Sequence, residues 1–271
     1  MNRKVGAFAA ALAVLAVTFC SAAWADWTLN MPRGVTTISP EIYRLHMLIL
    51  WVCTVIGVGV FGAMIYAIVT FRKDKGAQPA KFTHNTKAEV IWTTIPALIL
   101  IALAIPAAET LVKIEDTRDS ELTIKVTGFQ WGWHYDYIDE GVRFYSFLDR
   151  ESNAARRLRS GIDPRSVENY LLNVDNPVVV PVDTKVRLLI TAADVLHAWW
   201  VPQFAVKKDA IPGYVNEAWF TATQTGTFRG QCAELCGMDH GFMPIVVKVV
   251  TREEFEEWVA ENAAPTMTRS N

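Results

Sequence analysis

Two long uncharged runs of apolar residues constrain the fold of this chain more than any other feature. The first covers residues 47–71 and the second covers residues 90–108, and neither contains Asp, Glu, Lys or Arg. About 20 apolar residues in a helix are enough to cross the hydrocarbon core of a bilayer. A bilayer offers no water to backbone N–H and C=O groups, so a spanning segment of this kind must be helical. We therefore expect a two-helix transmembrane hairpin.

The segments around this hairpin predict its orientation. The loop at residues 72–87 holds five basic residues and one acidic residue, which is typical of a cytoplasmic loop. Residues 1–25 have the pattern of a secretory signal, because a basic start precedes an apolar stretch and Ala23 and Ala25 form a cleavage site. An N-terminal membrane anchor is the alternative, although the stretch is short for a span. Both features place the chain after the second span outside the cytoplasm.

Beyond the hairpin the pattern changes to short runs in which apolar and polar residues alternate. Such runs, with turn signals between them, are typical of strands in a sandwich or barrel. One helix is expected at the C-terminus, where Thr251 and Glu254 fit a capping box. We divide the chain into a signal peptide (1–25), an outer segment with the hairpin (26–112) and an extracytoplasmic domain (113–271). The alternating runs are residues 122–127, 185–191, 217–221 and 245–250.

An arginine-rich segment at residues 149–169 interrupts the strands. We interpret it as a surface excursion, part helix and part loop. Proteins that bind single-stranded nucleic acid combine basic residues with aromatic side chains that stack on bases. No aromatic residue interleaves with these arginines. A nucleic-acid partner is therefore not expected.

The loop from Cys232 to Met243 concentrates metal ligands. It contains Cys232, Cys236, His240 and Met243 within twelve residues, so these donors can converge only if the loop curls around what it binds. Thiolate and thioether are soft ligands that select copper, whereas imidazole also serves zinc and iron. His197 is a further nitrogen donor that a sandwich fold could bring beside the loop. The set as a whole predicts a copper site.

Two other interpretations of this loop are open. A lone Cys-x-x-x-Cys pair in an extracytoplasmic protein is often a disulfide. A structural zinc site with two cysteines and two histidines is the second alternative, but such sites are usually closed and four-coordinate and have no thioether ligand. Met243 and the two histidines favour copper over both.

The motifs around these ligands resemble those of a known family. Residues 230–245, together with residues 195–199 and 208–213, closely resemble subunit II of haem-copper cytochrome c oxidase, of the copper-A type. The resemblance implies a two-helix transmembrane hairpin followed by an all-β cupredoxin-like Greek-key sandwich. It also implies a bacterial inner membrane location with the C-terminal domain in the periplasm, and association with the haem-bearing subunit I and further oxidase subunits.

The same resemblance implies a function and a ligand set. The subunit is expected to accept electrons from cytochrome c and pass them to haem in subunit I, supporting oxygen reduction and proton pumping outside this chain. In the family, two cysteine sulfurs bridge two copper ions, each copper takes one histidine, and a methionine and a backbone carbonyl complete the site. The family also binds a magnesium ion jointly with subunit I through a carboxylate, here that of Glu234. The copper ligands carried over are His197, Cys232, Glu234 (through its carbonyl), Cys236, His240 and Met243.

Two further residues take roles from the resemblance. Trp131 follows Gln130 in an aromatic-rich segment, and the matching tryptophan of the family is where electrons arrive from cytochrome c. The alternative is that this segment is a strand whose aromatic residues fill a core. Glu89 matches a glutamate at the mouth of a proton pathway into subunit I, although ionisable residues at helix ends often just meet the interface. Tyr214 departs from the family, which usually has arginine there.

The charge outside the membrane favours a basic partner. Removal of the signal peptide leaves 24 basic and 28 acidic residues, and subtracting the cytoplasmic loop leaves a net charge of −8. An acidic surface raises the encounter rate with a basic redox protein. Ordinary solvated carboxylates are the alternative for each one. The carboxylates expected at the docking rim are Asp136, Asp139, Glu140, Asp175 and Asp194.

Two other protein classes share some of these features. A membrane-anchored copper chaperone can also carry Cys-x-x-x-Cys and a distant histidine, but it has a thioredoxin-like fold and typically one span. Subunit II of a quinol oxidase has the same fold but lacks the copper ligands. The two spans, Met243 and the complete ligand set argue against both.

Overall fold

The computed structural model describes residues 30–263. The expected signal peptide at residues 1–25 lies outside this range. Two long helices, α2 (Ser39–Thr70) and α3 (Thr86–Ile114), contain the two apolar runs and are long and apolar enough to cross a membrane. The central stretches of both helices are not buried by any other part of the described chain. Lipid or other subunits must therefore cover them.

The ends of the two helices show why they begin and pair as they do. The side chain of Asn85 caps α3 by accepting a hydrogen bond from the N–H of Ala88, which satisfies a donor that the first turn leaves free. At the other end of the hairpin, Lys113 forms an ion pair with Glu41 at 2.8 Å. Pro106 lies inside α3, and Thr110 one turn later donates its hydroxyl to the carbonyl oxygen of Pro106.

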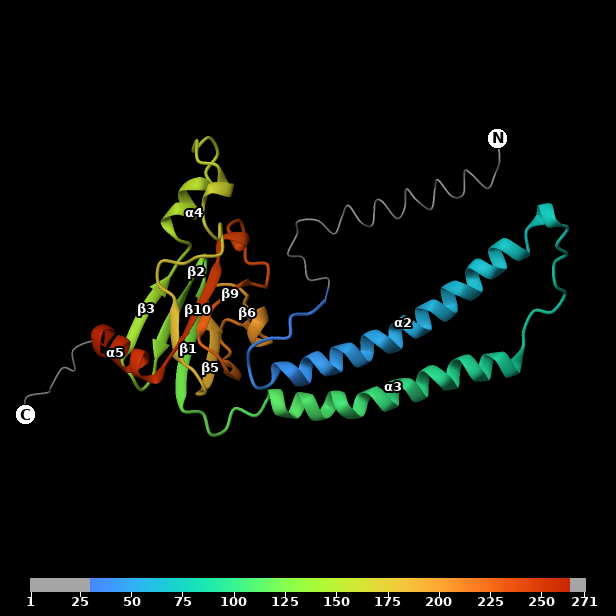
Figure 1. The fold of residues 1–271 in the computed structure, drawn as a ribbon, viewed down its shortest axis with the longest axis horizontal. Coiled ribbons are helices and arrows are strands. Elements are labelled where there is room, and N and C mark those ends of the chain that lie inside the picture. Colours follow the sequence, from blue (N-terminus) through green and yellow to red (C-terminus); the bar gives the residue numbers. More distant parts are fainter. Residues whose placement is uncertain (1–29, 264–271) are drawn as a thin grey trace, which may run out of the picture. The chain divides into compact units, whose positions relative to one another are not determined.

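The rest of the described chain contains two five-stranded sheets (Figure 1). Most neighbouring strands are antiparallel, but β1 pairs in parallel with β5, and β4 with β10. The first sheet has the order β3 (Val142–Ser146), β2 (Gly132–Tyr137), β1 (Leu122–Phe129), β5 (Lys185–Ala192) and β8 (Asn216–Thr221). The second has the order β4 (Val178–Pro181), β10 (Pro244–Val250), β9 (Gly226–Cys232), β6 (His197–Val201) and β7 (Val206–Ala210).

Alternation along the strands builds the core. In β1 and β5 every second residue is buried, as expected for strands with one face on a core. Large aromatic residues complete the core, and several of their polar atoms are paired. The indole of Trp199 donates to the hydroxyl of Tyr135 at 3.2 Å, and the hydroxyl of Tyr137 bonds the backbone of Val179. All four alternating runs predicted from the sequence are strands, and the two-sheet β domain confirms the predicted fold class.

In the part of the β domain that the structure describes, two α-helices lie outside the sheets. The C-terminal helix α5 (Arg252–Asn262) begins with the predicted capping box, in which Thr251 and Glu254 each bond the other's backbone N–H. The arginine-rich excursion contains α4 (Arg150–Ala155) and a short 3-10 turn, η2 (Pro164–Ser166), joined by exposed loop, as predicted. In Figure 1, α4 projects beyond the ends of β2 and β3.

Candidate metal centre

Neighbouring strands of one sheet bring the predicted ligands together. His197 is the first residue of β6, and Cys232 is the last residue of β9. The chain then forms the ligand loop, passes through the 3-10 turn η4 (His240–Phe242) and enters β10 directly after Met243. Because β6 and β10 both pair antiparallel with β9, the first residues of β6 and β10 lie beside the last residues of β9 at one end of the sheet.

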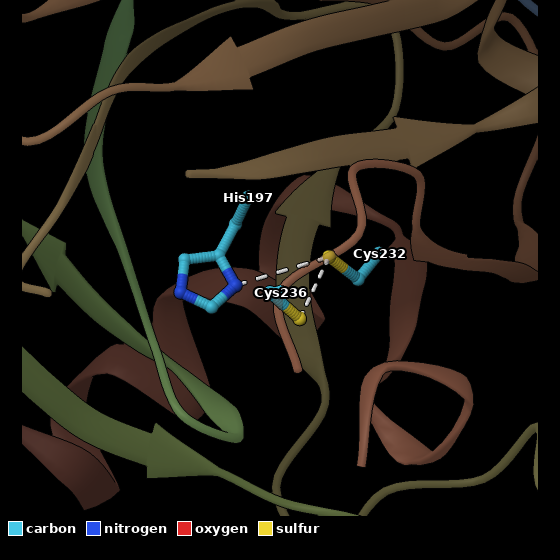
Figure 2. A group of neighbouring side chains, drawn as sticks. All are labelled: His197, Cys232 and Cys236. Atoms are coloured by element: carbon cyan, nitrogen blue, oxygen red, sulfur yellow. Dashed lines mark hydrogen bonds between the residues drawn. The ribbon is translucent and has the colours of Figure 1, made fainter. Parts of the chain in front are cut away.

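The side chains of three predicted ligands point toward one another, as Figure 2 shows. The ligand atoms of His197, Cys232 and Cys236 all lie within 4.8 Å of one another. The two sulfurs are 3.8 Å apart, and Nδ1 of His197 is 3.9 Å from Sγ of Cys232. Both cysteines are free thiols. The disulfide alternative therefore does not describe this structure.

The remaining predicted ligands lie around this group. Nδ1 of His240 is 3.5 Å from Sγ of Cys236, and the carbonyl oxygen of Glu234 is 3.4 Å from Sγ of Cys232. Met243 is only 1% exposed and belongs to the same buried cluster as the two cysteines. Its carbonyl accepts a hydrogen bond from the N–H of Cys232 at 3.0 Å. The arrangement is paired, with one imidazole beside each sulfur.

Residues outside the ligand set fix the orientation of His197. Its Nε2 lies 3.0 Å from Oδ1 of Asp194, which leaves Nδ1 on the side of the sulfurs. Metal-binding histidines commonly use the second ring nitrogen in this way. A Cβ atom at Gly128 would lie 3.0 Å from the His197 ring, so any residue larger than glycine would force the ring to shift. The sequence predicts only a docking role for Asp194 and not this contact with His197. The Asp-x-x-His spacing is the sequence signal that could have indicated it.

The two thiols have different acidities. Burial opposes ionisation of Cys232, but hydrogen bonds from His197 and from the backbone outweigh it and lower its pKa to about 7. Burial, followed by the charge of Cys232, raises the pKa of Cys236 to about 12. Burial alone would lower the pKa of His197, yet the neighbouring Cys232 and Asp194 raise it. Metal binding must therefore displace a proton that Cys236 holds firmly, as is general for thiolate sites.

Trp131 and Gln130 contact the loop from the turn between β1 and β2. The indole Nε1 of Trp131 and Nε2 of Gln130 both donate to the carbonyl oxygen of Cys236, at 3.2 and 2.8 Å. Gly237 has a φ of 118° and a Cβ there would lie 3.1 Å from the indole ring, so this close approach requires glycine. Trp131 is half-buried just before β2, whereas Trp133 and Tyr135 within the strand are fully buried.

The donor chemistry of this site fits copper. Two free thiols, two imidazoles and a buried thioether converge on it, and soft sulfur donors select copper. A closed structural zinc site would use the two cysteines and two histidines and leave Met243 without a role. The residues present therefore fit a copper site better than a zinc site.

Comparisons with known proteins agree with this chemistry. Residues 122–250 match the family described as "Cytochrome C oxidase subunit II, periplasmic domain", and residues 24–109 match its transmembrane domain. A probable cytochrome c oxidase subunit 2 of Rickettsia bellii is 39% identical over 249 residues, which cover 91% of this chain and 89% of the relative. The chain belongs to the cytochrome c oxidase subunit II family. It is a subunit of a cytochrome c oxidase, with two membrane spans and a periplasmic domain.

Other subunits II are similarly close. That of Cereibacter sphaeroides is 36% identical over 246 residues, covering 88% of this chain and 81% of the relative. The crystal structure of the periplasmic domain of subunit II from Bradyrhizobium japonicum is 46% identical and covers 54% of this chain and 96% of that domain, with a TM-score of 0.47.

Three further residues named from the sequence lie outside the ligand loop. Glu89 is in the first turn of α3, where its carboxylate accepts a hydrogen bond from the backbone N–H of Asn85 at 3.3 Å. Asp136 forms an ion pair with Arg143. Tyr214, which the resemblance gives as a departure from the family, is 60% exposed.

Four of the five expected docking carboxylates divide between the two ends of the first sheet, and Asp136 lies within β2. Asp194 bonds the backbone of Gln130, and Asp175 accepts from the N–H of Phe147, whose ring lies against Gly132. Both therefore lie near Trp131. Asp139 and Glu140 follow β2, which begins beside Trp131, and six residues of strand at about 3.3 Å each place them roughly 20 Å further along.

Proposed function

We propose that this subunit II binds two copper ions, with the thiolates of Cys232 and Cys236 as the shared ligands. His197 and His240 would each serve one copper, with Met243 and the carbonyl of Glu234 completing the set. The paired arrangement supports this proposal most directly, because each sulfur has one imidazole nitrogen within 3.9 Å.

The proposed copper pair gives the chain its place in the oxidase. When bound, two copper ions bridged by thiolates would share one electron, taken from cytochrome c and passed to the haem of subunit I. The protein keeps Cys232, Cys236 and Met243 buried in a loop that other elements hold, which limits how far the ligands move when the charge changes. Trp131 would be the surface group nearest the donor, since it is half-buried and hydrogen-bonded to the backbone of Cys236.

Further roles are proposals from the family. The carboxylate of Glu234 would bind a magnesium ion shared with subunit I, for which oxygen donors are suited. Glu89, in the first turn of α3, would stand at a proton-path entrance into subunit I. Residues 1–25 would be removed as a signal peptide, leaving the hairpin (26–112) and the periplasmic domain (113–271). Docking of cytochrome c would involve Asp136, Asp139, Glu140, Asp175 and Asp194, of which Asp175 and Asp194 are best placed.

The test of the copper proposal is the metal content of the purified oxidase. We expect two copper ions assigned to subunit II and an electron paramagnetic resonance spectrum in which one unpaired electron couples equally to two copper nuclei. The variant Cys236→Ser should lose that spectrum, whereas Cys53→Ser in α2 should keep it, since Cys53 is a free cysteine of the transmembrane hairpin. A spectrum from a single copper nucleus, or zinc in place of copper, would show that the binuclear assignment is wrong.

A further inference from the structure

The arginine-rich excursion touches the ligand loop through one side chain. Arg156, directly after α4, donates from its two terminal nitrogens to the two carboxylate oxygens of Asp239, both at 3.1 Å. The guanidinium also lies over the ring of Phe242, 4.3 Å from its centroid. Its Nε donates to the side chain of Asn153 within α4 at 2.8 Å. We call these three contacts the Arg156 brace.

The two loop residues held by the brace flank two proposed copper ligands. Asp239 directly precedes His240, and Phe242 directly precedes Met243. Arg156 therefore holds the turn η4 at both of its ends. A bidentate pair fixes orientation as well as distance, and stacking on an aromatic face requires the flat guanidinium that lysine lacks. The side chains of Arg156 and Asp239 are about three-quarters buried, so water competes less for this pair than for an exposed one.

The rest of the site shows why this half of the loop needs such a contact. His197 is oriented by Asp194, and the carbonyl of Cys236 is held by Gln130 and Trp131. The stretch between Gly237 and Phe242 contains two local backbone hydrogen bonds, but its tip is exposed, and Met238 is 84% exposed. The Arg156 brace ties this exposed stretch to a separate element of the domain.

We propose that Arg156 is a positioning residue that keeps His240 and Met243 in place for the metal before the metal arrives. The proposal rests on the copper function proposed above. It gives the excursion a role in the site, since α4 anchors the guanidinium through Asn153. Loss of the brace should loosen residues 239–243 locally, without loosening the core strands.

The experiment compares Arg156→Lys with Arg187→Lys in the purified full-length chain. Arg187 is a matched control, because it also pairs with both oxygens of one carboxylate, that of Glu217, in the same domain. In the copper-free protein we expect amide hydrogen exchange at residues 239–243 to become about tenfold faster in Arg156→Lys, with exchange in β1 and β5 unchanged, since about 1.4 kcal/mol corresponds to a factor of ten. In the copper-loaded protein we expect a copper(I) chelator to remove copper faster from Arg156→Lys than from Arg187→Lys.

The outcomes separate this inference from the copper proposal. Unchanged exchange at residues 239–243 would overturn the role of Arg156 whatever metal is bound. Faster exchange with copper release equal to that of Arg187→Lys would also overturn it, because the contact would then be structural only. If Arg156→Lys fails to fold, Asp239→Asn decides by the same two criteria. If the wild-type protein binds no copper pair, the proposed function fails, while the exchange measurement still decides whether the brace holds the loop.

Discussion

At the scale of single residues, Trp131 is the strongest candidate for the point where electrons arrive. Its indole is half-buried and bonds the carbonyl of Cys236, so it joins the surface to a proposed copper ligand. In Trp131→Ala we expect turnover of the assembled oxidase with cytochrome c to fall by on the order of tenfold or more, equivalent to at least about 1.4 kcal/mol of activation free energy.

Two controls accompany this prediction. Trp219→Phe changes a tryptophan whose indole bonds the backbone of Lys113, away from the ligand loop, and should leave turnover unchanged. Copper content in Trp131→Ala should equal that of the wild type. Wild-type turnover in Trp131→Ala would remove this residue from the electron path.

Asp194 contributes to the site through His197. Replacement by alanine leaves Nε2 of His197 without its carboxylate partner, and loss of such a partner typically costs a factor of about 10–100 in metal affinity. We expect Asp194→Ala to lose copper to a chelator at a correspondingly lower chelator concentration. Asp139 is an exposed acid far along the sheet, and Asp139→Ala should lose copper at the same chelator concentration as the wild type. If both variants lose copper at the same chelator concentration, the orienting role of Asp194 is contradicted.

The sequence indicates the ligands better than their supports. Cys232, Cys236, His240 and Met243 are recognisable because four soft or borderline donors within twelve residues of one chain form a ligand set on their own. Arg156 carries no local signal, and Asp194 carries only its Asp-x-x-His spacing, which does not fix where the carboxylate points. A carboxylate that orients an imidazole, and an arginine 83 residues before its partner, acquire their roles only when the strands and α4 are placed in space.

At the scale of elements, regular alternation decides what is predictable. The runs that became β1, β5 and β8 alternate because one face of each meets the core, whereas β10 is buried at each of its first four positions. The short strand β4 is buried throughout, and β6 is buried at all but one position, so neither shows a period of two. Their places depend on pairing with distant strands, which a local pattern does not contain.

The predicted capping box of α5 can be tested directly by amide hydrogen exchange. In Thr251→Ala the hydroxyl that accepts from the N–H of Glu254 is lost, and loss of such a cap costs about 1 kcal/mol. We expect the amides of the first turn of α5 to exchange about fivefold faster, since about 1.4 kcal/mol corresponds to tenfold. Glu256→Ala, exposed on the same helix, should change exchange little, and a similar acceleration in both variants would show that the cap is not responsible.

For the molecule as a whole, charge should govern how the proposed electron donor, cytochrome c, approaches. The segments outside the membrane carry a net charge of −8 if the signal peptide is removed, so a basic donor should be attracted over long distances at low salt. Position still matters, because about 0.1 M salt screens exposed charges beyond roughly 10 Å. An acid near Trp131 should therefore affect association more than one at the far end of β2.

Asp175 and Asp139 test this difference as a matched pair. Asp175 lies near Trp131, and an asparagine there keeps an oxygen to accept from the N–H of Phe147. Asp139 follows the far end of β2, roughly 20 Å away by strand length.

In the assembled oxidase we expect Asp175→Asn to lower the association rate constant for cytochrome c several-fold at about 0.1 M salt, because a charge at the rim acts mainly on association. Asp139→Asn should lower it much less, and the gap between the two variants should narrow as salt rises further, while turnover at saturating cytochrome c stays at the wild-type value in both. Equal effects of the two substitutions on association would mean that the donor senses only the net charge of the domain and docks without using the rim around Trp131.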